Sequence, residues 1–246
     1  MISSLLSQTS LNDFKLEASN ISELNERTIL IKKWNWDYEL AHKFQRHCLT
    51  VLDKNPSIRL VICCSHPRVF THGRGLQKAK KGEKLELVDF DKSLSGSLPY
   101  PYFQIERGGG LTFHHPGQMI IYPILRLNPK TLSLSSLVDT LLDTAIEILQ
   151  EWGINNLSHT NQLLGLWHGE RKLASMGIAI EKLTTFHGMA LNFYQDDDMK
   201  KALMVLNPCG LKAEIYTSVE EIMNLQDKNL EVFSDTFLRR ISHAWK

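Results

Sequence analysis

Apolar residues recur with a helical spacing in two long segments of this chain. From Asp37 to Asp53 they follow the 3.6-residue period of a helix, and the Asp37 carboxylate can cap the first turn. A second amphipathic helix is predicted between Ser133 and Trp152, closed by Gly153. Two strong helices therefore interrupt a chain whose other apolar stretches are short.

Two further helices are expected nearer the C-terminus. Thr217 or Ser218 can cap a short one, and Glu220 and Glu221 suit the positive N-terminal end of its dipole. A last helix is predicted over residues 229–244.

The short apolar stretches are bounded by Gly or charged residues, which is typical of strands. The strands are expected at 28–31, 58–64, 102–106, 119–125, 163–168, 172–180 and 184–194. Neither a repeat nor a break in composition divides the chain. The pattern therefore predicts one α/β (α+β) domain over 28–246, with a mixed central sheet flanked by helices, after a loosely ordered leader at 1–27.

Composition excludes several classes of protein. The chain has 246 residues, 43% of them hydrophobic and 22% charged, which is enough to bury a core without metals or disulfides. A formal net charge of +1 creates no overall field for nucleic acid or anionic membrane. No stretch approaches the roughly 20 apolar residues that span a bilayer, and the first residues lack the pattern of a signal peptide. We expect a cytoplasmic protein that binds neither nucleic acid nor membrane.

The four cysteines fall into two kinds. Cys63 and Cys64 are adjacent in an apolar run, where a strand would bury them on opposite faces. No Cys-x-x-Cys occurs, so the sequence carries no zinc or redox motif. Cys209 differs because it lies between Pro208 and Gly210 in an irregular segment, where a thiol is accessible. From the residues alone Cys209 is either a nucleophile or a harmless loop thiol.

A nucleophilic cysteine needs a neighbouring cation, because its unperturbed pKa near 8.5 leaves only a few per cent thiolate at neutral pH. Lys172 is one candidate, as the last charge before an apolar strand. A lysine beside a desolvating sheet can pair with a thiolate. The alternative is a solvated lysine in a turn.

The densest unusual segment runs from Arg107 through three glycines to His114 and Gln118. Consecutive glycines cost conformational entropy and are typical of places where the backbone approaches another group closely. The run matches neither of the two common glycine-rich nucleotide loops. We expect a loop that lines a ligand channel; a plain strand–turn–strand connection is the alternative.

Six motifs in order resemble those of lipoyl(octanoyl) transferases, whose fold group includes lipoate and biotin ligases. The resemblance extends from about residue 34 to about residue 224. The motifs are Trp34-x-x-Asp37-Tyr38-Glu-x-Ala41, His66-Pro-x-Val-Phe-Thr71-x-Gly73-Arg, Arg107-Gly-Gly-x-x-Thr-Phe-His114-x-Pro-Gly-Gln118, Lys172-Leu-Ala-Ser-Met-Gly177, Phe186-His-Gly-Met-Ala-Leu-Asn192 and Pro208-Cys209-Gly210.

The resemblance implies a lipoate/biotin protein ligase-like fold and a thioester mechanism. Cys209 corresponds to the nucleophile that takes octanoyl from an acyl carrier protein, and Lys172 to the lysine that lowers its pKa. Because a thioester is already activated, neither ATP nor a metal or other cofactor is expected. Amides of the glycine-rich segments could stabilise the oxyanion. The implied acyl-binding residues are Arg107, Gly108, Gly109, Gly110, Leu111, Thr112, Phe113, His114, Ser175, Met176, Gly177, Gly188, Met189 and Ala190.

The implied partners are octanoyl-acyl carrier protein as donor and, as acceptors, lipoyl domains of 2-oxoacid dehydrogenases and the glycine cleavage H protein. Four lysines (Lys78, Lys80, Lys81 and Lys84) in the irregular stretch 74–99 could steer such acidic partners. A solvated loop is an equal alternative.

Three positions depart from the family pattern. Ser65 stands where the family usually has Glu, Gly110 where it has a longer side chain, and His115 where glycine is common. We expect these departures to affect the reaction rate and the preferred length of the acyl chain. Three rival functions are an ATP-dependent lipoate or biotin ligase, a non-catalytic lipoyl-domain binder and a cysteine hydrolase.

Overall fold

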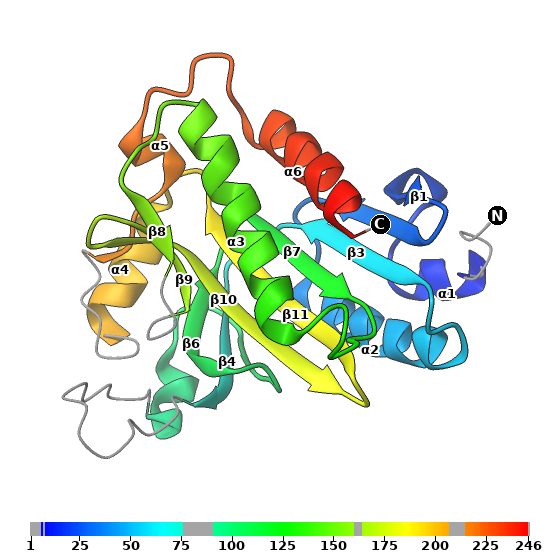
Figure 1. Cartoon of the computed structure of the whole chain (residues 1–246). Helices are drawn as coiled ribbons and strands as arrows, with labels where there is room; N and C mark the ends of the chain where they lie inside the picture. The colour runs from blue at the N-terminus through cyan, green and yellow to red at the C-terminus, as the bar shows by residue number, and fades with distance from the viewer. Residues whose placement is uncertain (1–5, 7, 76–90, 160–163, 207–214, 246) are drawn as a thin grey trace.

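An eight-stranded sheet and a three-stranded sheet form the framework of the protein (Figure 1). The structure is a computed structural model, and it describes residues 6, 8–75, 91–159, 164–206 and 215–245. In spatial order, the large sheet contains β1 (Ile21–Asn25), β2 (Thr28–Lys33), β3 (Arg59–Cys64), β7 (Gln118–Ile124), β11 (Thr184–Asn192), β10 (Arg171–Glu181), β9 (Gly165–His168) and β8 (Leu157–His159). The small sheet contains β5 (Tyr102–Gln104), β4 (Val69–Gly75) and β6 (Gly109–His114).

The large sheet is mixed, as the sequence predicted, and so is the small sheet, which the sequence did not predict. In the large sheet β2 and β3 run parallel, and every other neighbouring pair is antiparallel. In the small sheet β4 is parallel to β5 and antiparallel to β6. The helices are α1 (Gln8–Asp13), α2 (Tyr38–Lys54), α3 (Leu134–Glu151), α4 (Asp197–Leu206), α5 (Val219–Ile222) and α6 (Leu230–Ala244), with short 3-10 turns η2 (Ala18–Asn20) and η3 (Lys92–Ser97).

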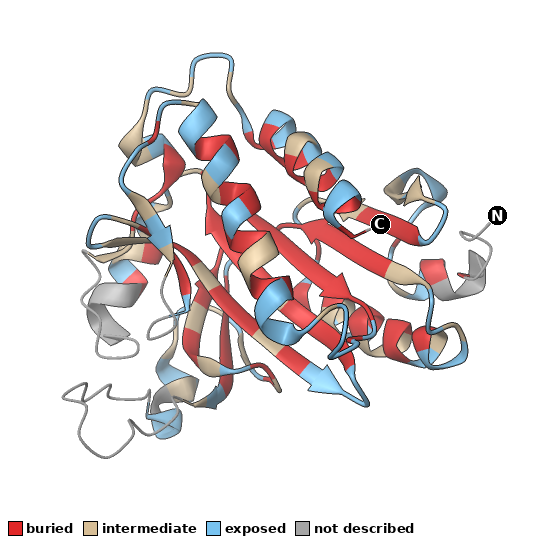
Figure 2. Ribbon diagram, viewed as in Figure 1, coloured by how far each residue is buried: buried red, intermediate tan, exposed pale blue. Residues whose placement is uncertain are grey.

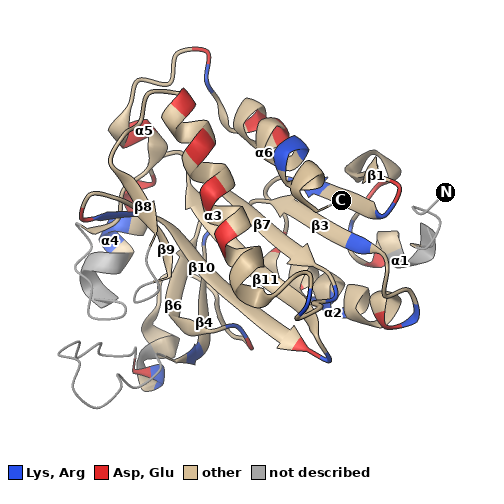
Figure 3. Ribbon diagram, viewed as in Figure 1, with Lys and Arg blue, Asp and Glu red and all other residues tan. Residues whose placement is uncertain are grey.

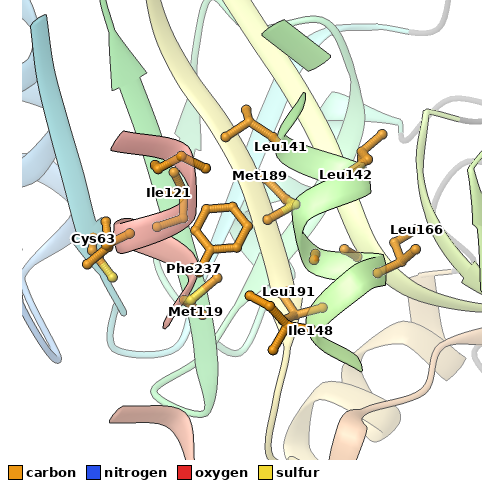
Figure 4. Packing of buried hydrophobic residues seen from close by; sticks show 14 of the residues in the cluster. Cys63, Met119, Ile121, Leu141, Leu142, Ile148, Leu166, Met189, Leu191 and Phe237 are labelled. Carbon is orange, nitrogen blue, oxygen red and sulfur yellow. The ribbon is translucent and has the colours of Figure 1, made fainter. Parts of the chain in front are cut away.

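Helices cover the two faces of the large sheet differently. The helices α3 and α6 pack on one face, where Leu141, Phe237 and their neighbours meet Met119 and Ile121 of β7 (Figure 4). The helix α2 packs on the opposite face, against residues such as Ile120 of β7. Figure 2 shows the central strands of the sheet and the inner stripes of the helices as a buried layer, whereas the outer strand β8 and the end of β10 are more exposed. Successive residues of β7 therefore serve two separate cores.

Adjacent strand residues confirm this two-sided burial. Cys63 belongs to the core under α3 and α6, and Cys64 to the core under α2. Both thiols are fully buried and unpaired, as expected of neighbours on a strand that point to opposite faces.

The helix ends confirm the predicted caps. The Asp37 carboxylate accepts from the Leu40 amide at 3.0 Å at the start of α2. Ser218 caps α5 and forms a capping box with Glu221. Gly153 follows α3 with φ +96°, a conformation that favours glycine.

Several parts of the fold differ from the prediction, including β8, which the pattern did not indicate. The glycine-rich run was expected as a loop, but residues 109–114 form β6, because β4, which the pattern did not indicate, supplies a pairing partner. The helix α4 was not expected either. The predicted loose leader also differs: β1 pairs with β2, and buried Leu6, Leu11 and Leu16 join the core under α2.

The surface of α3 carries a row of acidic residues along its length (Figure 3). Arg240 of α6 pairs with two of them, Glu147 and Glu151. Within the described residues no helix combines the length and the apolar character that crossing a bilayer requires.

Candidate active site

A cavity that is partly open to solvent lies where β6, β7, β10 and β11 meet the start of α2. Its lining mixes apolar and polar side chains. The lining residues are Tyr38, Ile105, Arg107, Thr112, His114, Ile120, Tyr122, Ser175, Met176, Gly177, His187, Gly188, Met189 and Ala190.

Nine of the fourteen predicted acyl-binding residues line this cavity. They are Arg107, Thr112, His114, Ser175, Met176, Gly177, Gly188, Met189 and Ala190. Five do not line it, which corrects the expectation that the whole run from Arg107 to His114 would: Gly108, Gly109, Gly110, Leu111 and Phe113. Strand alternation in β6 accounts for two of the five, Leu111 and Phe113. Thr112 and His114 face the cavity, whereas Leu111 and Phe113 pack into a separate apolar cluster.

Gly177 allows Arg107 to lie across the sheet. A Cβ at residue 177 would come within 3.0 Å of the Arg107 Cδ and of the Gly108 carbonyl oxygen. The Gly108 amide donates to the carbonyl of Ile178 at 3.5 Å. The glycine-rich segment is thus fastened to β10.

A chain of hydrogen bonds holds Arg107 and His114 in place. The Arg107 Nη2 donates to both the carbonyl and the Oγ1 of Thr71, each at 2.9 Å. The Thr71 hydroxyl then donates to the His114 Nε2 at 3.2 Å, and the His114 Nδ1 donates to the Gln118 Oε1 at 3.0 Å. The Gln118 amide continues to the Asn192 Oδ1 at 2.9 Å. Strands from both sheets are therefore joined by one polar network.

This network reaches the strand that carries Lys172. The Asn192 Nδ2 donates to the carbonyl of Thr217 at 3.0 Å, and the Thr217 amide donates to the carbonyl of Lys172 at 3.0 Å. The position of the Lys172 backbone is thus linked to that of Arg107 through buried hydrogen bonds.

Burial keeps the imidazoles around the cavity neutral. It lowers the pKa of His114 well below its ordinary value, and the pKa of His66 to about 4. The His66 Nδ1 donates to the Trp36 carbonyl at 2.7 Å, and the Tyr122 hydroxyl donates to the His66 Nε2 at 2.9 Å. Burial also raises the pKa of Tyr122 well above its ordinary value, so it remains a donor.

A half-buried cluster adjoins the cavity at His187. Its backbone has φ +57°, and the amide donates to the Gln45 side chain of α2 at 2.8 Å. The Glu106 Oε2 lies 3.8 Å from the His187 Nε2 and 3.0 Å from the His42 Nε2. Burial lowers the pKa of His187 to about 4, and the neighbouring His187 lowers the pKa of Glu106 to about 2.

Five lining residues were not predicted as site residues: Tyr38, Ile105, Ile120, Tyr122 and His187. Tyr38 and His187 lie inside two of the six sequence motifs, so the motifs could have identified both as site residues. Nothing in the alternation of β7 distinguishes the cavity positions Ile120 and Tyr122 from ordinary core positions.

Lys172 lies on β10, three residues before Ser175 of the cavity wall. Its ammonium is 5.5 Å from the centre of the Trp167 ring, within the range of a cation–π contact. Its backbone pairs with that of Tyr216. A Cβ at Gly165 would come within 3.0 Å of the Lys172 Cε, so the absence of a side chain there makes room for the lysine.

Cys209 and the lysines from Lys78 to Lys84 lie outside the described residues. The predicted contact between Cys209 and Lys172 therefore stays a prediction, as does the steering role of the lysine cluster.

The three family departures have defined places. Ser65 is buried, and its hydroxyl accepts from the Asn35 amide at 2.8 Å. Gly110 is buried within β6. His115 is 1% exposed in the turn after β6, where its Nδ1 accepts from the Gly117 amide at 3.2 Å. His115 does not line the cavity, so it does not narrow the cavity directly.

Comparison with known proteins places this geometry in a family. The family model described as the lipoyl protein ligase A/B catalytic domain matches residues 37–242. An octanoyltransferase from Syntrophobacter fumaroxidans is 32% identical over 198 residues, 80% of this chain and 81% of that protein. A chloroplastic octanoyltransferase from Arabidopsis thaliana is 27% identical over 234 residues, 91% of this chain and 78% of that protein.

Solved structures show the same fold at low sequence identity. A lipoate-protein ligase A bound with ATP matches with a TM-score of 0.63 and 13% identity, over 88% of this chain and 84% of that one. A bipartite lipoate protein ligase from Thermoplasma acidophilum, studied with its E2 lipoyl domain, matches with a TM-score of 0.58 and 12% identity, over 88% of this chain and 82% of that one.

Proposed function

This chain belongs to the lipoyl protein ligase A/B family and is an octanoyltransferase, and we propose that it carries octanoyl on Cys209 between two protein partners. The donor is the thioester of octanoyl-acyl carrier protein. The acceptor is the ε-amine of a lysine on a lipoyl domain, such as those of 2-oxoacid dehydrogenases and the glycine cleavage H protein.

The proposed reaction has two half-reactions that each exchange one bond. In the first, the Cys209 thiolate attacks the donor carbonyl, the thioester bond of the carrier breaks, and the carrier leaves as a thiol after taking up a proton. In the second, the acceptor amine attacks the acyl-cysteine, an amide forms, and the amine's proton passes to the released Cys209 sulfur. The activated thioester supplies the driving force, so the proposal includes neither ATP nor a metal.

The observation that carries this proposal is the cavity whose wall includes part of β10, the strand that also carries Lys172. The apolar lining residues Ile105, Ile120 and Ala190 can bury the methylenes of an acyl chain. Lys172 lies three residues along β10 from Ser175 of the cavity wall. A cavity with both apolar and polar lining residues, on a strand that also carries a lysine, suits an acyl-thioester and the thiolate that attacks it.

In this proposal Lys172 lowers the pKa of the Cys209 thiol. Lys172 lies near the start of β10, whose following residues are largely buried. Its ammonium lies over the Trp167 ring, and Gly165 leaves room for its side chain. A reduced, reactive thiol also agrees with the cytoplasmic location that composition predicts.

The deciding experiment supplies octanoyl in two forms. Intact-mass spectrometry of the wild type with octanoyl-acyl carrier protein and no ATP is expected to show one octanoyl adduct, absent from Cys209→Ser. Adding a lipoyl domain is expected to discharge the adduct and octanoylate the domain. Cys48→Ser, which changes a fully buried thiol, is the matched control and is expected to load normally.

The alternatives predict different outcomes. Modification of the lipoyl domain only with free octanoate and ATP would replace the proposal by a ligase mechanism, the activity suggested by the ATP-bound structural relative. Release of free octanoate without an acceptor would indicate a hydrolase. Tight binding of a lipoyl domain with no adduct under any condition would indicate a binder.

The role of Lys172 has its own test. Lys172→Ala is expected to shift the pH profile of Cys209 alkylation to higher pH, because a thiolate without a cation forms less readily. Lys182→Ala, a 73% exposed side chain at the β10–β11 turn, is the control and leaves the profile unchanged. An unshifted profile in Lys172→Ala would remove this role.

A further inference from the structure

We propose that His42, Glu106 and His187 form a binding site for one divalent transition-metal ion of the zinc class, separate from the acyl-transfer chemistry. The three residues come from distant parts of the sequence: α2, the segment before β6, and β11. Their candidate ligand atoms all lie within 4.8 Å of one another.

The donor set is the one that such ions prefer. Two imidazole nitrogens and one carboxylate oxygen are a recurrent set of three zinc ligands, which leaves a fourth position for water. The His42 Nε2 is 3.0 Å and the His187 Nε2 is 3.8 Å from the same Glu106 Oε2. Metal-bonding distances of about 2.0–2.2 Å from a common centre would require the two partly exposed side chains, His42 and Glu106, to adjust around the buried His187.

The buried Nε2 of His187 indicates that a ligand binds in this cluster. The His187 side chain is 2% exposed, and within the described part of the chain its Nε2 has no hydrogen-bond partner. An orphaned buried nitrogen is costly unless something else satisfies it. A metal ion shared with Glu106 and His42 would do so.

The surroundings define the charge at the site. Arg46 Nη1 lies 3.9 Å from the Glu106 Oε1, and 2.7 Å from Glu181, which is its closer partner. Arg107 follows Glu106 in the chain but directs its guanidinium to Thr71. The Oε2 of Glu106 is the oxygen that faces the two imidazoles, while Arg46 lies nearer its Oε1 and Arg107 donates to Thr71.

The site would connect α2 with the cavity wall. His187 and its neighbour Gly188 line the cavity, and His42 is on the helix that covers this face of the sheet. An ion that bridges them would hold α2 against β11.

The test uses the full chain with Cys209→Ser as background, because a thiolate would itself bind the metal. Calorimetric titration of the metal-free protein with Zn²⁺ is expected to show one site, and Co²⁺ is expected to give visible absorption of tetrahedral intensity at the same stoichiometry. His42→Gln and Glu106→Gln should each weaken binding by more than about tenfold. Mg²⁺, which prefers oxygen ligands, should not bind there.

His159→Gln is the matched control. His159 pairs with Asp143 at 3.0 Å, an equivalent histidine–carboxylate contact to which the described part of the chain adds no third ligand. It should leave the affinity unchanged. Equal affinity in wild type, His42→Gln and Glu106→Gln, or no saturable Zn²⁺ binding, would overturn the proposal and leave Glu106 as a carboxylate that merely bridges two imidazoles. Unfolding in chelator checks that each variant folds.

Discussion

The two faces of the large sheet differ in the kind of side chain that they bury, although the same strands form both. On the face under α3 and α6 the buried contacts are almost entirely between apolar side chains such as Met119, Ile121 and Phe237. On the opposite side, α2 and the small sheet enclose Arg107 and several imidazoles together with apolar residues. Apolar burial on the first face stabilises the fold. This stability offsets the cost of burying polar groups around the cavity on the other face.

This contrast explains why the polar side depends on a complete network. A buried polar group that loses its partner costs more than the bond itself contributes. The Thr71 hydroxyl, for example, accepts from Arg107 and donates to His114. The apolar face has no comparable dependence on single bonds, so its substitutions should act through volume alone.

The largest expected effect is a loss of stability in acid, caused by the polar side. Burial lowers the pKa of His66, His115 and His187 to about 4, below the unfolded value of 6.5. Between these values the unfolded chain binds more protons, so stability is present above pH 6.5 and falls as the pH drops towards 4. Three such groups should lower the free energy of unfolding by about 5 kcal/mol from about pH 7 to pH 5.

Urea unfolding across this pH range measures the slope. His66→Asn, which retains a donor towards the Trp36 carbonyl, should reduce the slope by about 1.4 kcal/mol per pH unit at most, the contribution of one group. A free energy of unfolding that stays flat between pH 7 and pH 5 would show that these imidazoles are not buried as neutral groups.

The next largest effect tests the apolar face. Phe237→Ala removes a fully buried ring of α6 and should cost about 3–5 kcal/mol. Acyl loading per folded molecule, measured by intact mass, should not change, because Phe237 lies on the side away from the cavity. Val232→Ala, 46% exposed on the same helix, should change stability by less than about 0.5 kcal/mol. Impaired loading in folded Phe237→Ala would mean that the two faces are coupled.

The smallest expected changes in the free energy of unfolding come from two buried threonines, one on each side of the sheet, and they compare the two sides directly. Thr71→Val breaks the link between Arg107 and His114 and should cost about 1–3 kcal/mol while slowing acyl loading. Thr28 is also fully buried, on the same side of β2 as Leu30 of the apolar core, and among the described residues its hydroxyl finds no partner. Thr28→Val should therefore be neutral or stabilising by up to about 1 kcal/mol. Equal losses in both variants would remove the distinction.

Sequence patterns predicted the apolar face well and the polar side incompletely. The 3.6-residue periods of α2 and α3 fix helices without knowledge of their partners, and both were confirmed. The strand β6 was missed because glycine has no strand preference, and its pairing with β4 depends on residues far away. Local patterns carry no information about such non-local contacts.

The candidate site shows the same limit. The motifs supplied nine lining residues, but not which side of β6 would face the cavity. Tyr122 was not predicted because its role depends on His66, 56 residues earlier, whose ring it reaches only in the folded sheet. The position of Cys209 relative to Lys172 remains a prediction.

The position of β7 in the sheet affects how the protein folds during its synthesis. It lies between β3, which precedes it in the chain, and β11, which follows it by some sixty residues. While the ribosome synthesises that interval, at about 5–20 residues per second, one side of β7 has no partner strand. An apolar strand with an open edge is a template for pairing between chains. A nascent chain of this protein is therefore exposed to aggregation for several seconds, and its yield should depend on chaperones until residue 192 has emerged.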